Sequence, residues 1–202
     1  MGKPSTTSPG MKTTARNLYE LNVKLVDTHP PVWRRLEVAG DLPMNRLHRV
    51  LQTAFGWSDR SPHVFTVGKR RIGSPEQEAD PHLLNERKLR LEELVRKPHV
   101  TFYYIYDPER EWTLELHVEQ LQRSEKTSPT VRCLDGKRAA PPEALEGALA
   151  WQELLAILND PADPDHAQRR QEVGPDFDPE AFDPEVLNRE WSAMEKSPRD
   201  LP

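Results

Sequence analysis

The feature that most constrains the fold of this chain is a two-residue hydrophobic period. In residues 18–26 (LYELNVKLV) every second residue is apolar. Residues 100–118 (VTFYYIYDPEREWTLELHV) repeat the pattern on both sides of a DPER turn. Successive side chains of a strand point to opposite faces, so this period predicts half-buried strands. The second stretch predicts a β-hairpin with an aromatic inner face.

Between these strands the period changes to three and four residues. Residues 43–55 place apolar side chains on one stripe of a helix, with Asp41 and Pro43 where a cap and a first-turn proline belong. Gly56 is a suitable C-terminal stop. Further strands are predicted at 32–38 and 63–73, the latter with a turn at Gly68. Residues 73–88 predict a loop and 90–95 a short helix.

Beyond Cys133 the chain is punctuated by proline, and helices are predicted at 149–158, 163–174 and 183–194. Strands followed by helices, without regular alternation, favour an α+β fold. We expect a curved, mostly antiparallel sheet of about five or six strands, one long helix packed on it, and C-terminal helices. Residues 17–195 would form a single domain, 1–16 a disordered leader and 196–202 a flexible tail.

Composition excludes several classes of protein. A membrane helix needs roughly 18 consecutive apolar residues, and no such run occurs in the chain. The single cysteine forms no internal disulfide, so a cytoplasmic location is expected. A net charge of −5 argues against a generic nucleic-acid coat protein.

The segment 131–147 (VRCLDGKRAAPPEALEG) holds that cysteine. A structural zinc site needs about four Cys or His ligands, and Cys133 has no cysteine partner. We therefore interpret Cys133 as a small buried hydrophobe, LDG as a tight turn and the proline pair as a stiff connection. No metal or cofactor is predicted, and P-loop, GxGxxG, GxSxG and HExxH motifs are absent from the sequence.

Aromatic, cationic and histidine side chains gather around the long helix and its flanking strands. His48 lies at the edge of the helix stripe, His63 opens the next strand, and Trp57 falls between them. The candidate binding surface consists of Trp33, Arg34, Arg35, His48, Trp57 and His63. A second candidate is the hairpin tip Lys69, Arg70 and Arg71, whose charge suits phosphate contacts.

Taken together, the segments PPVWRR, LHRVLQTAFGW and FDPEAFD resemble the plasmid pRiA4b ORF-3-like family, in order from about Tyr19 to Leu187. The resemblance implies a compact α+β domain found in bacteria and archaea on chromosomes, plasmids and insertion elements. Some members are labelled as mobile-element passenger proteins related to resolvases. The serine nucleophile context of a resolvase is not apparent here.

The chain departs from the family pattern at two places. The family pattern implies further cysteines around the proline pair, and Ala140 stands where the second would fall. It also implies a histidine in YDFGDxWxH, where this chain has Leu114. If those residues form a site in other members, we expect it to be degraded here.

Three hypotheses about function follow. The first is a non-enzymatic binding or accessory module linked to plasmids or mobile elements, acting on a protein partner or another ligand. The second is a metal-assisted hydrolase or nuclease that uses His48, His63 and Asp107. The third is nucleic-acid binding through the basic hairpin, with an affinity that falls steeply with salt.

Overall fold

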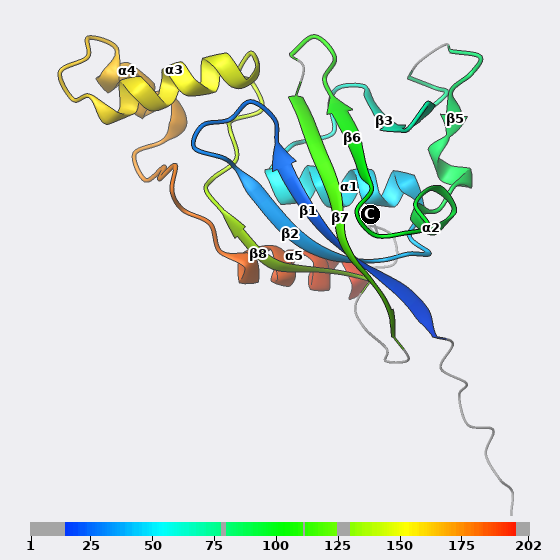
Figure 1. Ribbon diagram of the computed structural model, residues 1–202. Helices are drawn as coiled ribbons and strands as arrows, with labels where there is room; N and C mark the ends of the chain where they lie inside the picture. The colour runs from blue at the N-terminus through cyan, green and yellow to red at the C-terminus, as the bar shows by residue number, and fades with distance from the viewer. Residues whose placement is uncertain (1–14, 78–79, 111, 125–129, 197–202) are drawn as a thin grey trace, which may run out of the picture.

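The computed structural model describes residues 15–77, 80–110, 112–124 and 130–196 (Figure 1). The expected leader and tail therefore lie almost wholly outside the described residues. The strands are β1 (Arg16–Leu25), β2 (Trp33–Ala39), β3 (His63–Val67), β4 (Arg70–Gly73), β5 (Leu84–Asn85), β6 (Thr101–Tyr106), β7 (Trp112–Ser124) and β8 (Val131–Lys137). The helices are α1 (Met44–Phe55), η1 (Glu86–Lys88, a 3₁₀ turn), α2 (Leu91–Leu94), α3 (Gly147–Asn159), α4 (His166–Val173) and α5 (Pro184–Lys196).

The strands form one open sheet in the order β5-β4-β3-β6-β7-β1-β2-β8. Every neighbouring pair is antiparallel except β4 and β5, which are parallel. This confirms the predicted α+β class and the mostly antiparallel sheet. The expected count of strands was too low, because the sheet has eight.

The two-residue period separates the two faces of the sheet. Apolar side chains of β1, β2, β6 and β7 share the core face, including Leu21, Leu36, Phe102 and Leu116, all with no exposed area. Helix α1 lies across this face in Figure 1. The alternate side chains of the same strands are mostly polar and at most half-buried, such as Glu115 on β7.

Helix α1 matches its predicted range, and its apolar stripe is buried against the sheet. Its C-terminal stop is also confirmed, since Gly56 has φ +65°, a left-handed conformation that glycine adopts without strain. The predicted Asp41 cap is wrong. The backbone N–H of Met44 donates to the carbonyl of Leu89 at 3.0 Å, and Asp41 instead pairs with Arg16 at 3.0 Å.

Two segments without a clear period contain structure that the sequence pattern did not predict. Residues 73–88 are not only a loop, because they include β5 and η1. The segment LDG is not a tight turn but part of β8, which pairs with β2 through an irregular register at Arg35/Leu36. Cys133 on β8 is buried, as predicted, and its backbone N–H donates to Asn188 of α5.

The C-terminal helices extend the core at one side of the sheet. Leu187 and Trp191 of α5 are buried, and Asp183 caps this helix by accepting from the N–H of Glu185 at 2.9 Å. The expectation that one helix is long is not confirmed, since α3 and α5 have 13 residues each and α1 has 12. Among the described residues, no helix combines the length and apolar character that crossing a bilayer requires.

Candidate functional site

The centre of the candidate site is a stacked pair of histidines, His48 from α1 and His63 from β3. Their ring centroids are 3.6 Å apart and the ring planes differ by 7°. Both side chains are buried, at 4% and 5% exposure. The pair forms because α1 crosses the sheet where His63 opens β3, so residues 15 apart in sequence meet face to face.

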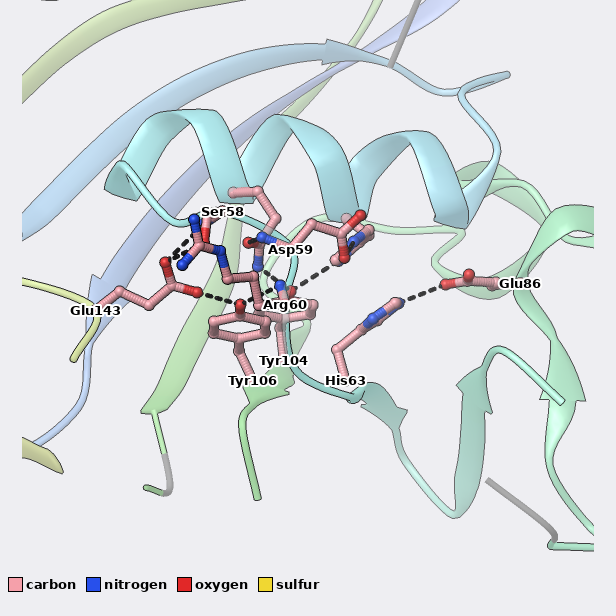
Figure 2. Close-up of polar contacts among 10 residues, drawn as sticks. Ser58, Asp59, Arg60, His63, Glu86, Tyr104, Tyr106 and Glu143 are labelled. Carbon is pink, nitrogen blue, oxygen red and sulfur yellow. Dashed lines mark hydrogen bonds and ion pairs between the residues drawn. The ribbon is translucent and has the colours of Figure 1, made fainter. Parts of the chain in front are cut away.

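Each histidine contacts its own carboxylate (Figure 2). His48 Nε2 lies 2.9 Å from Asp59 Oδ1, and His63 Nε2 lies 2.8 Å from Glu86 Oε2. Glu86 is itself buried, whereas 43% of the Asp59 side chain is exposed. One end of the cluster is therefore closed and the other reaches the surface.

A hydrogen-bond network fixes the ring of His48. His48 Nδ1 lies 2.8 Å from the Tyr104 hydroxyl, which also accepts from Gln52 Nε2 at 2.8 Å. The same Gln52 accepts the backbone N–H of Asp59 at 2.8 Å through its amide oxygen. By contrast, His63 Nδ1 is buried and has no hydrogen-bond partner among the described residues.

The loop after α1 that carries Asp59 is anchored by Glu143. The Ser58 backbone N–H and hydroxyl donate to Glu143 Oε2 at 3.0 and 2.5 Å, and the Tyr106 hydroxyl donates to Oε1. Figure 2 shows Glu143 reaching this loop from the opposite side to Glu86. Gln52, which accepts from the Asp59 N–H, and Glu143, which accepts from Ser58, therefore hold this loop together.

Burial determines the protonation of the network. Desolvation, together with the neighbouring His63, lowers the pKa of His48 to about 4, although Asp59 acts in the opposite direction. Desolvation also raises the pKa of Tyr104 well above its ordinary value. At neutral pH His48 is therefore a neutral imidazole beside a neutral phenol, and a neutral imidazole is the form that binds metal ions.

These residues have the donor set of a transition-metal site. One ligand atom each from His48, Asp59 and His63 lies within 4.8 Å of the others. Imidazole nitrogen and carboxylate oxygen suit zinc and similar divalent ions. The sequence alone predicts no metal here, because two histidines 15 residues apart are a weak signal and neither Asp59 nor Glu86 stands out among its many acidic residues.

Asp107, which the hydrolase hypothesis named, is not part of this group. Its carboxylate accepts from the Ser61 hydroxyl at 2.9 Å and pairs with Arg110 at 2.5 Å. It therefore stabilises the turn after β6. The carboxylates that contact the histidines are Asp59 and Glu86 instead.

The six residues of the predicted binding surface lie in three separate environments. His48 and His63 form the cluster. Trp57 is buried and stacks on Tyr106 at 5.0 Å, on the side of the loop that faces the core.

The remaining three residues lie on β2. Arg34 points to the core face and is 2% exposed, Arg35 points to the other face and pairs with Glu119 at 2.9 Å, and Trp33 is half-buried at the start of the strand. The opposite orientation of the two arginines follows from the strand period.

The three basic residues Lys69–Arg71 are exposed at the turn between β3 and β4. Arg71 pairs with Asp80 at 2.6 Å, and Arg70 donates to the carbonyl of Leu94 at 3.3 Å. Two of the three side chains thus already have partners within the chain.

Leu114 is paired with Tyr104, the residue whose hydroxyl contacts His48. It is fully buried on β7 and stands directly opposite Tyr104 of β6 in the sheet register. Directly opposed residues have Cβ atoms about 4.5–5.5 Å apart. A histidine at this position would therefore lie beside Tyr104.

An open, mostly antiparallel sheet with helix α1 on its core face, and a histidine–carboxylate cluster between α1 and β3, define an α+β protein with an internal polar site. Its residues 17–186 match the plasmid pRiA4b ORF-3-like protein family, and the chain belongs to this family. The uncharacterized protein y4hQ of Sinorhizobium fredii (strain NGR234) is 29% identical over 175 residues, which cover 86% of this chain and 90% of y4hQ.

A solved structure extends the similarity. The crystal structure of MM3350, a protein of unknown function from Methanosarcina mazei Go1, superposes with a TM-score of 0.77 at 28% identity. The match covers 86% of this chain and 98% of MM3350. The predicted resemblance to the family is thereby confirmed.

Proposed function

We propose that this protein is a non-enzymatic binding module, linked to plasmids or mobile elements and acting in the cytoplasm, that holds a divalent transition-metal ion at the paired-histidine cluster. The observation that carries the proposal is the convergence of ligand atoms of His48, His63 and Asp59 within 4.8 Å, with both histidines buried. The unpartnered Nδ1 of His63 supports it, because buried polar atoms without a partner are rare in folded proteins.

The stacked geometry determines how an ion would bind. A metal ion lies in the plane of each imidazole that ligates it, at about 2.0–2.1 Å from nitrogen for zinc. Two parallel rings 3.6 Å apart cannot meet that condition together. Binding therefore requires one ring to tilt, and every pair of ligand atoms, now within 4.8 Å of one another, to reach a spacing of about 3.3 Å, which tetrahedral bonds of this length impose.

The burial of the cluster favours binding over catalysis. Both histidines are at most 5% exposed, so Asp59 is the one member of the trio with substantial contact to solvent. A catalytic site must admit substrate to the ion, and the burial of both histidines leaves access through the Asp59 side alone. This restricted access favours binding of an ion over turnover of a substrate.

The test is metal binding by the purified, untagged protein. We expect one equivalent of zinc by elemental mass spectrometry, and visible absorption bands after replacement with Co²⁺. His63→Asn and His48→Gln should lose the bands, whereas His117→Gln, at a half-buried histidine of β7 outside the cluster, is the matched control and should keep them. Folded wild-type protein that binds Co²⁺ no better than His63→Asn would refute the proposal.

Nucleic-acid binding by the basic hairpin is the second candidate function. The exposure of Lys69, Arg70 and Arg71 on one turn supports it, while the ion pair of Arg71 with Asp80 weakens it because a phosphate would compete with that carboxylate. Fluorescence anisotropy with labelled duplex DNA at about 50 mM salt decides the matter. Absence of binding under that condition excludes this candidate.

A further inference from the structure

A second site of different chemistry lies around Arg34 of β2. The Arg34 side chain is 2% exposed, and among the described residues it has no ion pair with a carboxylate. Buried charges are normally paired, because removing an ion from water costs several kcal/mol. A buried guanidinium without a counter-ion therefore requires an explanation.

Part of the compensation comes from backbone carbonyls. Arg34 Nε donates to the carbonyl of Ala54 at 3.1 Å, and Nη1 donates to those of Trp33 and Lys137 at 2.8 and 3.1 Å. These three bonds use the hydrogens of Nε and Nη1. Within the described chain, the two hydrogens of Nη2 have no acceptor.

Aromatic rings enclose the rest of the guanidinium. The Phe182 ring centroid lies 3.8 Å from Arg34 Cζ and the Phe55 centroid 5.1 Å. Such cation–π contacts favour the charged form. Desolvation lowers the pKa of Arg34 to about 10, so the group still carries its positive charge at neutral pH.

Arg34 forms part of the wall of a pocket of about 780 Å³ between the C-terminus of α1 and α5. This volume is in the range of small-molecule sites. Most of the other lining side chains are apolar, namely Ala54, Phe55, Ala140, Pro141, Pro142, Phe177, Ala181, Phe182, Val186 and Leu187. Val186 is 43% exposed at the rim, so the pocket is open to solvent.

We propose that this pocket binds a small apolar monocarboxylic acid, with its carboxylate on Arg34 and its hydrocarbon part between Phe55, Phe182 and α5. The free Nη2 hydrogens supply donors for the carboxylate, and charge-assisted bonds of this type are about twice as strong as neutral ones. The site differs from the paired-histidine cluster in residues and in ligand, and does not depend on it.

The acidic residues of the pocket narrow the ligand class further. Asp183 and Glu190 also line it, and neither forms an ion pair with Arg34. A second carboxylate on the ligand would be repelled by them. The neighbouring thiol of Cys133 is neutral, because burial raises its pKa to about 11, so it does not neutralise Arg34.

The experiment is calorimetric titration of the full chain with octanoate, and with octanamide as the uncharged isostere. We expect saturable binding of octanoate with a Kd below about 1 mM and at least about tenfold weaker binding of octanamide. Equal affinity for the two compounds, or no saturation by octanoate up to that concentration, overturns the proposal.

Variants locate the binding. Arg34→Met should abolish binding of octanoate, with circular dichroism as the check on folding. Because that change removes three hydrogen bonds, Val186→Glu is the second variant: it lies at the exposed rim and should weaken octanoate binding at least about tenfold by charge repulsion. Leu84→Glu, a similarly exposed leucine on β5, is the matched control. Unchanged affinity in Val186→Glu places octanoate elsewhere and refutes this site.

Discussion

A methyl group added at Gly136 tests the packing above Arg34. Gly136 of β8 stands opposite Arg34 in the sheet, and a Cβ at this position would lie 2.3 Å from Cε1 of Phe182. Real Cβ contacts essentially never fall below 3.0 Å, so the Phe182 ring must move. Overpacking of this kind costs about 1–3 kcal/mol, to which loss of the cation–π contact contributes about 0.5–2 kcal/mol.

Chemical denaturation of wild type, Gly136→Ala, Phe182→Ala and the double variant measures the effect. We expect Gly136→Ala to lower the free energy of unfolding by about 1–3 kcal/mol, and to lower Tm by about 2–4 °C for each kcal/mol. In the Phe182→Ala background the same change should cost almost nothing, because the clashing ring is gone. An equal cost in both backgrounds would assign the effect to the strand backbone and refute the reasoning.

Three further outcomes are expected. Burial raises the pKa of Cys133 from its ordinary 9.0 to about 11 and that of Tyr19 from 10.0 to about 12. The unfolded chain ionises both groups at lower pH than the folded one, so the stability they contribute is present below pH 9 and is lost as the pH rises toward 12. Urea melts between pH 8 and 12 check this loss. Leu114→His should lower the free energy of unfolding of the metal-free protein by about 1–3 kcal/mol, since Leu114 is fully buried, and added zinc should reverse part of the loss if the new imidazole reaches the cluster. Glu143→Ala removes two hydrogen bonds from Ser58, on the loop that carries Asp59, and one from Tyr106 of β6; it should cost about 1–3 kcal/mol in thermal or chemical melts, and unchanged stability would show that Glu143 does not anchor the loop.

The elements that were predictable from the sequence are those with a regular hydrophobic period. Strand β1, the hairpin of β6 and β7, and helix α1 each bury one face, and burial imposes the period that identifies them. Strand β8 lacked this signal. It pairs on one side with β2 alone, and its Asp135 and Gly136 resemble turn residues although the backbone is extended.

The candidate site was predictable only in part. His48 and His63 were expected to lie near each other, and they do. Glu86 was not found, because it follows a two-residue strand in a polar segment without any period. Its burial depends on β5 adding to β4 at the edge of the sheet, a long-range pairing that local sequence does not encode.

The burial of Arg34 was missed for a similar reason. A charged arginine is normally expected at the surface. The strand period, however, places Arg34 on the core face of β2, the same face as Leu36. Its environment comes from Phe182, nearly 150 residues later in the chain. Contacts between such distant residues are defined only by the complete fold.

The position of β6 and β7 in the sheet has a consequence for synthesis of the chain. They stand between β3 and β1, so they join the β1–β2 hairpin to the β3–β4 hairpin, although both of those hairpins precede them in sequence. A nascent chain that has not yet released Thr101–Ser124 from the ribosome therefore holds two separate ribbons with unpaired inner edges. Unpaired edges invite association with other chains. The sheet can be completed only after β6 and β7, the last of its four central strands to be synthesised, have left the ribosome.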